Sequence, residues 1–94
     1  MYASVLLLKL ENANYDEMNQ VALRAPENYK GQKGFVSAVY YSDKEKGEYG
    51  LTSVWETKED LEASWDTLPS ETKERVNKYG TMNVYYVNNA FSAD

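Results

Sequence analysis

The residue types that most often carry out chemistry are missing from this chain. It has no histidine and no cysteine, so an imidazole base and a thiolate nucleophile are both excluded. Zinc, iron and copper sites depend largely on those two side chains. The carboxylates Asp43, Glu45 and Glu48 lack the spacing of a calcium loop and are better interpreted as a solvated hairpin tip. We therefore expect no metal ion and no cofactor, and the sequence assigns no catalytic residue.

Tyrosine is an abundant side chain with reactive potential, with nine copies in the chain. Tyr41 and Tyr85 are candidate proton carriers, but a phenol titrates near pH 10, so a role as a base requires a local perturbation. Packing at an interface is the alternative, and tyrosine is common there. The segment from Gly31 to Gly34 has the GxxG pattern of an RNA-binding loop, without the flanking helices that such a loop needs. We interpret it as a turn.

Two tryptophans, Trp55 and Trp65, could form the walls of a site for a flat aromatic molecule between a sheet and a helix. The alternative is that both are core residues. If Trp55 faces the helices, the alternation of a strand puts Ser53 beside it. Serine hydroxyls in an apolar cleft would hold a phenol or quinone, although they can equally bond to nearby backbone. The expected ligand-contacting residues are Phe35, Ser37, Ser53, Trp55, Leu61 and Trp65.

These side chains must be positioned by a small α+β fold. Short runs rich in apolar and aromatic residues, separated by polar turn residues, predict strands over 3–10, 35–41, 48–55 and 81–87. Helical spacing predicts helices after Asn14, ending at Pro26, and after Thr57, interrupted at Pro69. The segment after Pro26 is predicted to be a turn and loop. The order β-α-β-β-α-β predicts a ferredoxin-like four-stranded antiparallel sheet with both helices on one side.

Both faces of the predicted sheet are apolar, yet the helices can cover only one. In the first strand Val5 and Leu7 point to one side, and Leu6 and Leu8 point to the other. A bare apolar face usually marks an interaction site. We therefore expect a homodimer in which the two sheets pack against each other. The alternative is that a tail or long tyrosine side chains shield the face in a monomer.

Length and charge narrow the class of protein. The 94 residues suit one domain spanning 1–94. A net charge of −5 disfavours nucleic acid and anionic membranes as partners. No apolar run reaches the roughly 18 residues of a membrane span, and Lys9 interrupts the apolar start, which disfavours a signal peptide. We expect a cytoplasmic protein.

The stretches GFVSAVYYS and YGLTSVWETKEDLEASW make the chain similar to a known protein family. It resembles the antibiotic biosynthesis monooxygenase-like domains of the dimeric α/β-barrel superfamily. In that family a strand ends in a tryptophan, followed by an acidic residue and Ser or Thr that starts a helix. Trp55, Glu56 and Thr57 match this pattern, and Gly34 matches a glycine before the second strand.

The resemblance implies a dimeric α/β barrel and several possible activities. Some members are cofactor-free oxygenases of polycyclic phenols, and others degrade haem with an axial histidine some ten residues beyond a tryptophan. Trp65 matches that tryptophan, but Arg75 stands at the histidine position, which argues against haem degradation. The leading hypothesis is a small cofactor-independent monooxygenase-like protein that binds a flat hydrophobic or phenolic molecule. The alternative is a non-catalytic binding or assembly module.

Overall fold

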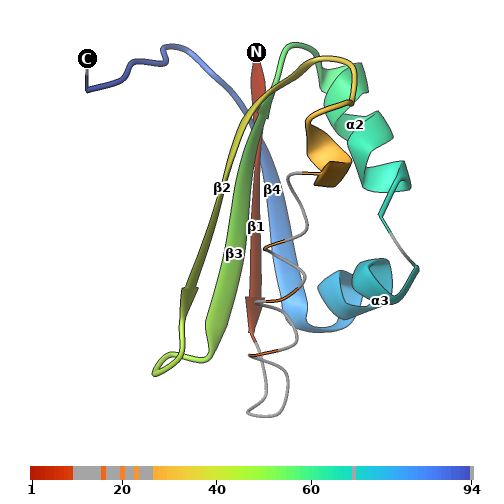
Figure 1. Cartoon of the computed structure of the whole chain (residues 1–94), viewed down its shortest axis with the longest axis vertical. Coiled ribbons are helices and arrows are strands. Elements are labelled where there is room, and N and C mark those ends of the chain that lie inside the picture. The colour runs from red at the N-terminus through yellow and green to blue at the C-terminus, as the bar shows by residue number, and fades with distance from the viewer. Residues whose placement is uncertain (10–15, 17–19, 21–22, 24–26, 69, 94) are drawn as a thin grey trace.

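The computed structural model describes residues 1–9, 16, 20, 23, 27–68 and 70–93. Its four strands are β1 (Tyr2–Lys9), β2 (Phe35–Asp43), β3 (Glu48–Trp55) and β4 (Gly80–Tyr86). They form one sheet in the order β2-β3-β1-β4, and every neighbouring pair is antiparallel (Figure 1). This is the strand order of a ferredoxin-like α+β fold, so the fold predicted from the sequence is confirmed.

Two helices lie between β3 and β4, namely α2 (Lys58–Asp66) and α3 (Ser70–Tyr79). Thr57 caps α2 as predicted, since its hydroxyl accepts a hydrogen bond from the backbone N–H of Asp60 at 3.1 Å. Within the described residues no helix is long and apolar enough to cross a bilayer.

The segment before β2 departs from the prediction. Asp16, Gln20 and Leu23 are helical, whereas Asn14 and most of the expected helix lie outside the described residues. Glu27, Asn28 and Tyr29 are helical too, so the expected loop after Pro26 is wrong at these positions. The reason is burial: Tyr29 keeps only 7 % of its surface exposed and packs its ring into the core.

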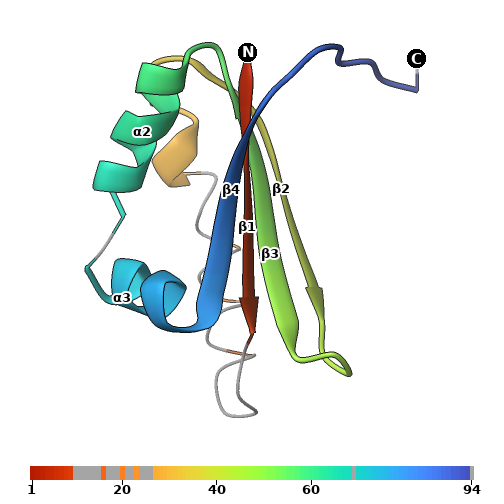
Figure 2. The same cartoon turned by 180° about the vertical axis from the view of Figure 1, so that it is seen from behind.

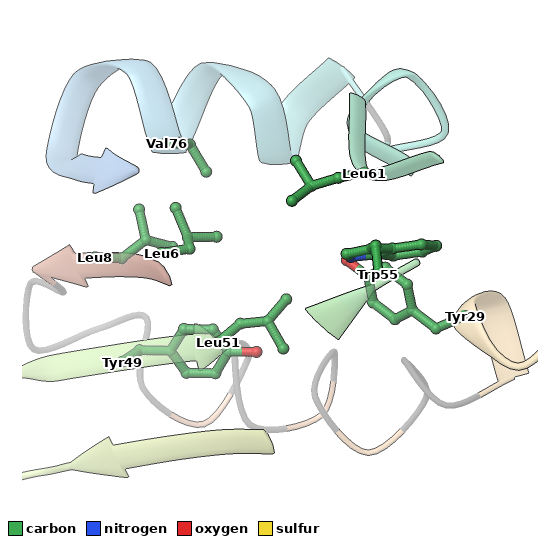
Figure 3. Packing of buried hydrophobic residues seen from close by; sticks show 8 residues of the cluster. All are labelled: Leu6, Leu8, Tyr29, Tyr49, Leu51, Trp55, Leu61 and Val76. Carbon is green, nitrogen blue, oxygen red and sulfur yellow. The ribbon is translucent and has the colours of Figure 1, made fainter. Parts of the chain in front are cut away.

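The helices cover one face of the sheet, as both views show (Figures 1 and 2). Every second residue of β1 and β3 points into that layer. In Figure 3, Leu61 of α2 and Val76 of α3 point down onto the leucines of the sheet. The buried hydrophobic cluster consists of Leu6, Leu8, Tyr29, Tyr49, Leu51, Trp55, Leu61 and Val76.

A β-bulge changes which side chains of β2 face the helices. Phe35 pairs with Trp55, but the next pair along is Ser37 with Val54, so one extra residue lies between them. From the bulge onward Ser37 points to the face away from the helices, together with Val39. The expectation that Ser37 stands beside Phe35 and Ser53 is therefore wrong, because the bulge shifts the register by one residue.

The face away from the helices, called here the open face, carries mainly small and apolar side chains. Val39 is 60 % exposed and Tyr85 is 55 % exposed. Tyr41 lies across Gly50, where a Cβ atom would collide with its ring, and its hydroxyl is 3.0 Å from Thr52 Oγ1. The open face consists of Ala3, Val5, Leu7, Ser37, Val39, Tyr41, Gly50, Thr52, Val54, Thr81, Asn83 and Tyr85.

Candidate functional site

A small cavity lies between the helix-facing side of the sheet and α2. It has a volume of about 20 Å³, measured as the space open to the centre of a water molecule. A site needs about 10–15 Å³ on that measure to hold one water. The cavity therefore has room for a single water molecule as it stands. Its walls are formed by Ser4, Leu6, Tyr29, Leu51, Ser53, Leu61, Ser64, Trp65, Leu68 and Met82.

Three serines give this cavity its polar character. Among the described residues, Ser4, Ser53 and Ser64 are the only polar side chains that are buried, and all three line the same cavity. Ser4 and Ser53 are opposite each other on β1 and β3, and Ser64 reaches down from α2. Buried hydroxyls in an apolar layer require hydrogen-bond partners. This cluster of hydroxyls can therefore hold a polar atom that enters the cavity.

Two of the three hydroxyls already make hydrogen bonds that fix their orientation. Ser64 donates to the carbonyl oxygen of Leu61 at 2.6 Å, so its proton is committed within the helix. Ser53 accepts from the indole Nε1 of Trp55 at 3.0 Å, so its own proton is left to donate elsewhere. The site thus offers a donor from Ser53 and an acceptor lone pair from Ser64.

The structure separates the two tryptophans. Trp55 has no exposed surface and is absent from the cavity wall, and its ring packs edge-on against Phe35 at 5.3 Å and Tyr29 at 6.0 Å. It is a core residue that supports the cavity from behind. Trp65 is half-buried and lines the cavity together with Leu61.

The expected site residues are therefore only partly brought together. Ser53, Leu61 and Trp65 lie in the cavity wall, whereas Phe35 lies behind it against Trp55. Ser37 lies on the open face. Sequence reasoning missed four wall residues whose positions matter below, namely Ser4, Tyr29, Ser64 and Met82. The alternation of β1 could have revealed Ser4, because it is in phase with Leu6 and Leu8.

Three tyrosine side chains gather at the β2–β3 side of the same layer. The rings of Tyr40 and Tyr49 lie 5.8 Å apart, and Tyr29 and Tyr49 point toward the middle of the sheet from opposite ends (Figure 3). Burial raises the pKa of all three phenols above their ordinary value. Repulsion between neighbouring phenolates raises the pKa of Tyr40 and of Tyr49 further. All three are neutral near pH 7.

One end of the cavity reaches the exposed edge of the sheet at β4. Met82 lines the cavity yet is 39 % exposed. Val84 and Tyr86 follow on the same face of β4, because they are opposite Ser4 and Tyr2, and both are exposed. An apolar strip thus leads from solvent to the serines. Among the described residues, no group of three or more acidic side chains could hold a metal ion.

Comparison with known proteins finds the fold of this chain among solved structures. No protein-family model matches the chain, and neither does any curated protein sequence. A candidate antibiotic biosynthesis monooxygenase from Deinococcus radiodurans superposes with a TM-score of 0.75 at 14 % identity, covering 100 % of this chain and 99 % of that one.

Two further solved structures have named activities. SnoaB from Streptomyces nogalater, a cofactor-independent oxygenase, gives a TM-score of 0.68 at 13 % identity, covering 95 % of this chain and 94 % of its own. The monooxygenase of the ActVA-Orf6 gene of Streptomyces coelicolor was solved with nanaomycin D. It gives a TM-score of 0.71 at 14 % identity, covering 99 % of this chain and 92 % of its own. At such identities the likeness establishes a shared fold.

Proposed function

We propose that this chain, which has the fold of the antibiotic biosynthesis monooxygenases, binds a small flat apolar molecule that carries an oxygen substituent. The observation that carries this proposal is the convergence of Ser4, Ser53 and Ser64 on one cavity in an otherwise apolar layer. Ligand sites combine apolar walls with a few placed polar groups, and this cavity has both. The relative solved with nanaomycin D supports an aromatic oxygen-bearing ligand.

Binding requires the cavity to widen, because its present volume of about 20 Å³ admits one water. The wall contributed by α2 is the one that must move, since the opposite wall is a hydrogen-bonded sheet. The helix is only nine residues long and brings Leu61, Ser64 and Trp65 to the cavity. A ligand entering from β4 displaces the helix outward and places an oxygen of its own against the serines.

Oxygenation is the second part of the proposal, and SnoaB supports it as a cofactor-independent oxygenase of the same fold. In such a reaction the substrate loses a proton to solvent, and its carbanion transfers an electron to dioxygen. The resulting radical and superoxide then combine in a C–O bond, and the peroxide takes up a proton and loses water to leave a carbonyl product. With no histidine in the chain, and with Tyr29, Tyr40 and Tyr49 held neutral, no strong base faces the cavity from the described residues. The substrate must therefore be acidic enough to ionise readily, as anthrones and quinols are.

A non-catalytic binding or assembly module is the competing function. Two observations favour it: Trp55 is wholly buried as a core residue, and the cavity as it stands has room for only one water molecule. A protein of this kind would use the same layer for stability and would show neither saturable ligand binding nor oxygen uptake.

Assembly as a homodimer through the open face completes the proposal. The face carries Val39, Tyr41 and Tyr85 with at least 42 % of each side chain exposed. Burial of apolar surface contributes about 25 cal/mol per Å², so covering a whole sheet face strongly favours association. A two-fold axis would bring the same face of a second copy against it. The ring of Tyr41 packs over Gly50 and adds to the apolar surface of this face.

The test is a titration of the purified chain with 1-tetralone and 1-naphthol, followed by the fluorescence of Trp65 and Trp55. Saturable quenching that is lost in Trp65→Phe and kept in Tyr85→Phe supports binding at the cavity. Oxygen uptake with anthrone as substrate would then identify an oxygenase, and binding without uptake would identify a binding module. Absence of saturable binding across both probes contradicts the proposal.

A further inference from the structure

Tyr29 belongs to two structures at once, the wall of the cavity and the cluster of tyrosines. Its ring is held on two sides, stacked on Phe35 at 5.9 Å and edge-on to Trp55 at 6.0 Å. Only 7 % of its surface is exposed, and it lines the cavity with the serines. A ring fixed in this way places its hydroxyl in one position rather than in many. The loss of side-chain freedom on ligand binding is therefore small.

The hydroxyl of Tyr40 stabilises that position. The two phenols share a hydrogen bond. A phenol oxygen can accept such a bond and still donate its own proton, so Tyr40 can hold the Tyr29 hydroxyl in place without using the proton of Tyr29. A phenol that accepts a hydrogen bond keeps its own proton for another partner and donates it more strongly.

Not every serine hydroxyl in the cavity wall can donate a hydrogen bond to a ligand. Ser64 has committed its proton to the carbonyl oxygen of Leu61. Ser53 keeps its proton, and its oxygen already accepts from Trp55. Ser53 can therefore donate from the sheet, and Tyr29, which also lines the cavity, can supply a second donor to an oxygen of the ligand.

We propose that the Tyr29 hydroxyl is the donor that recognises the oxygen of the ligand, and that Tyr40 is the positioning residue that holds it. The ligand class follows from the chemistry. A neutral donor selects an acceptor such as a ketone, a quinone carbonyl or a phenolate, and it offers nothing to a hydrocarbon of the same shape. This inference rests on the proposed function, since it needs a ligand in the cavity.

The test compares two probes of nearly equal shape, 1-tetralone with its carbonyl and tetralin without one. The natural protein is expected to bind 1-tetralone at least about fivefold more tightly than tetralin, as one good hydrogen bond implies. Tyr29→Phe should remove that preference, so that the two probes bind equally, and its urea unfolding transition shows whether the variant is folded. Tyr40→Phe should lower the ratio of tetralin to 1-tetralone dissociation constants to about half its value in the natural protein. Tyr85→Phe, on the open face, should leave this ratio unchanged.

The outcomes separate the two proposals. Equal binding of both probes, or a preference that survives Tyr29→Phe, overturns the role of Tyr29 and leaves the proposed function standing. Failure of both probes to bind overturns the proposed function, and this inference with it. If Tyr29→Phe does not fold, the natural protein labelled with carbon-13 at the tyrosine Cζ atoms decides the matter. The Tyr29 resonance must shift with 1-tetralone and stay in place with tetralin, and the reverse contradicts the inference.

Discussion

The indole Nε1 of Trp55 donates a hydrogen bond to Ser53 Oγ, 3.0 Å away and two residues earlier on the same face of β3. This bond satisfies the one polar atom of a tryptophan that has no exposed surface. It also fixes the serine that faces the cavity, with its proton directed away from the indole. The core and the candidate site are thus joined through a single hydroxyl.

Removal of that hydroxyl should be costly. Ser53→Ala leaves the buried indole N–H of Trp55 without a partner, so the free energy of unfolding should fall by about 1–3 kcal/mol. Ser64→Ala is the matched control, because its hydroxyl bonds only to the carbonyl oxygen of Leu61 within α2. That change should cost about 1 kcal/mol or less. Urea unfolding measures the free energy of unfolding of both variants. Equal losses would show that the Trp55–Ser53 hydrogen bond contributes no more to stability than the Ser64–Leu61 bond.

Substitution of Gly50 should lower the free energy of unfolding because of the neighbouring Tyr41 ring, not because of the backbone conformation of Gly50. A Cβ at position 50 would collide with the Tyr41 ring, so Gly50→Ala must push that ring off the sheet and break its contact with Thr52. The expected cost is about 1 kcal/mol, at the low end for overpacking, because the ring is partly exposed. In a Tyr41→Ala background the same change should cost nothing. Urea unfolding of the four proteins of this double-mutant cycle provides the measurement, and additive losses would contradict the explanation.

The tyrosine cluster predicts a loss of stability at high pH. Burial raises the pKa of Tyr29, Tyr40 and Tyr49 in the folded chain above the unfolded value of 10.0. Above that pH the unfolded chain releases these protons and the folded chain keeps them, so the free energy of unfolding falls as pH rises. Denaturant unfolding at a series of alkaline pH values measures the decline.

Tyr40→Phe and Tyr85→Phe form the matched pair for this effect. Loss of a buried phenol in Tyr40→Phe should make the alkaline decline less steep. Tyr85 is 55 % exposed, so Tyr85→Phe should leave the slope as it is. Tyrosinate absorbance gives an independent reading, since part of the tyrosine signal should appear only on unfolding. If the free energy of unfolding falls equally steeply with pH in both variants, the tyrosine cluster is not the cause of the alkaline loss of stability.

The open face predicts a dimer that a single charge can weaken. Val39 is 60 % exposed near the middle of β2, and Val39→Asp would bury a carboxylate without a partner in the interface. Ala63→Asp adds the same charge on an exposed position of α2. Light scattering at micromolar concentration should give twice the chain mass of 10.8 kDa for the natural protein and for Ala63→Asp, and a lower mass for Val39→Asp. A natural protein that stays monomeric contradicts the dimer.

Much of the fold was accessible from the sequence, because its signals are local. The strands are short runs rich in apolar and aromatic residues, Thr57 provides a cap for α2, and α2 ends at Asp66 before α3 begins at Ser70, as the predicted interruption requires. Tyr29 was misplaced for a physical reason. The turn residues around it indicate a loop, but the burial of its ring on Trp55 and Phe35 is a tertiary effect that no local pattern contains.

The site was less accessible than the fold. Ser37 was assigned to the wrong face because a β-bulge adds one residue to β2, and nothing in the neighbouring sequence marks its position. Ser64 was missed because a serine in a short polar helix is usually exposed, and only the packing of α2 on the sheet buries it. Trp55 could be placed on a strand, but whether it touched a ligand or the core depended on side chains from three elements.

The most direct test of ligand binding between the sheet and α2 is to locate the probe. Proton NMR of the chain saturated with 1-tetralone should show nuclear Overhauser contacts from the ligand to Trp65, Met82 and the β-protons of Ser53, which all line the cavity. Contacts confined to the open face, or none to any wall residue at saturation, would contradict the account.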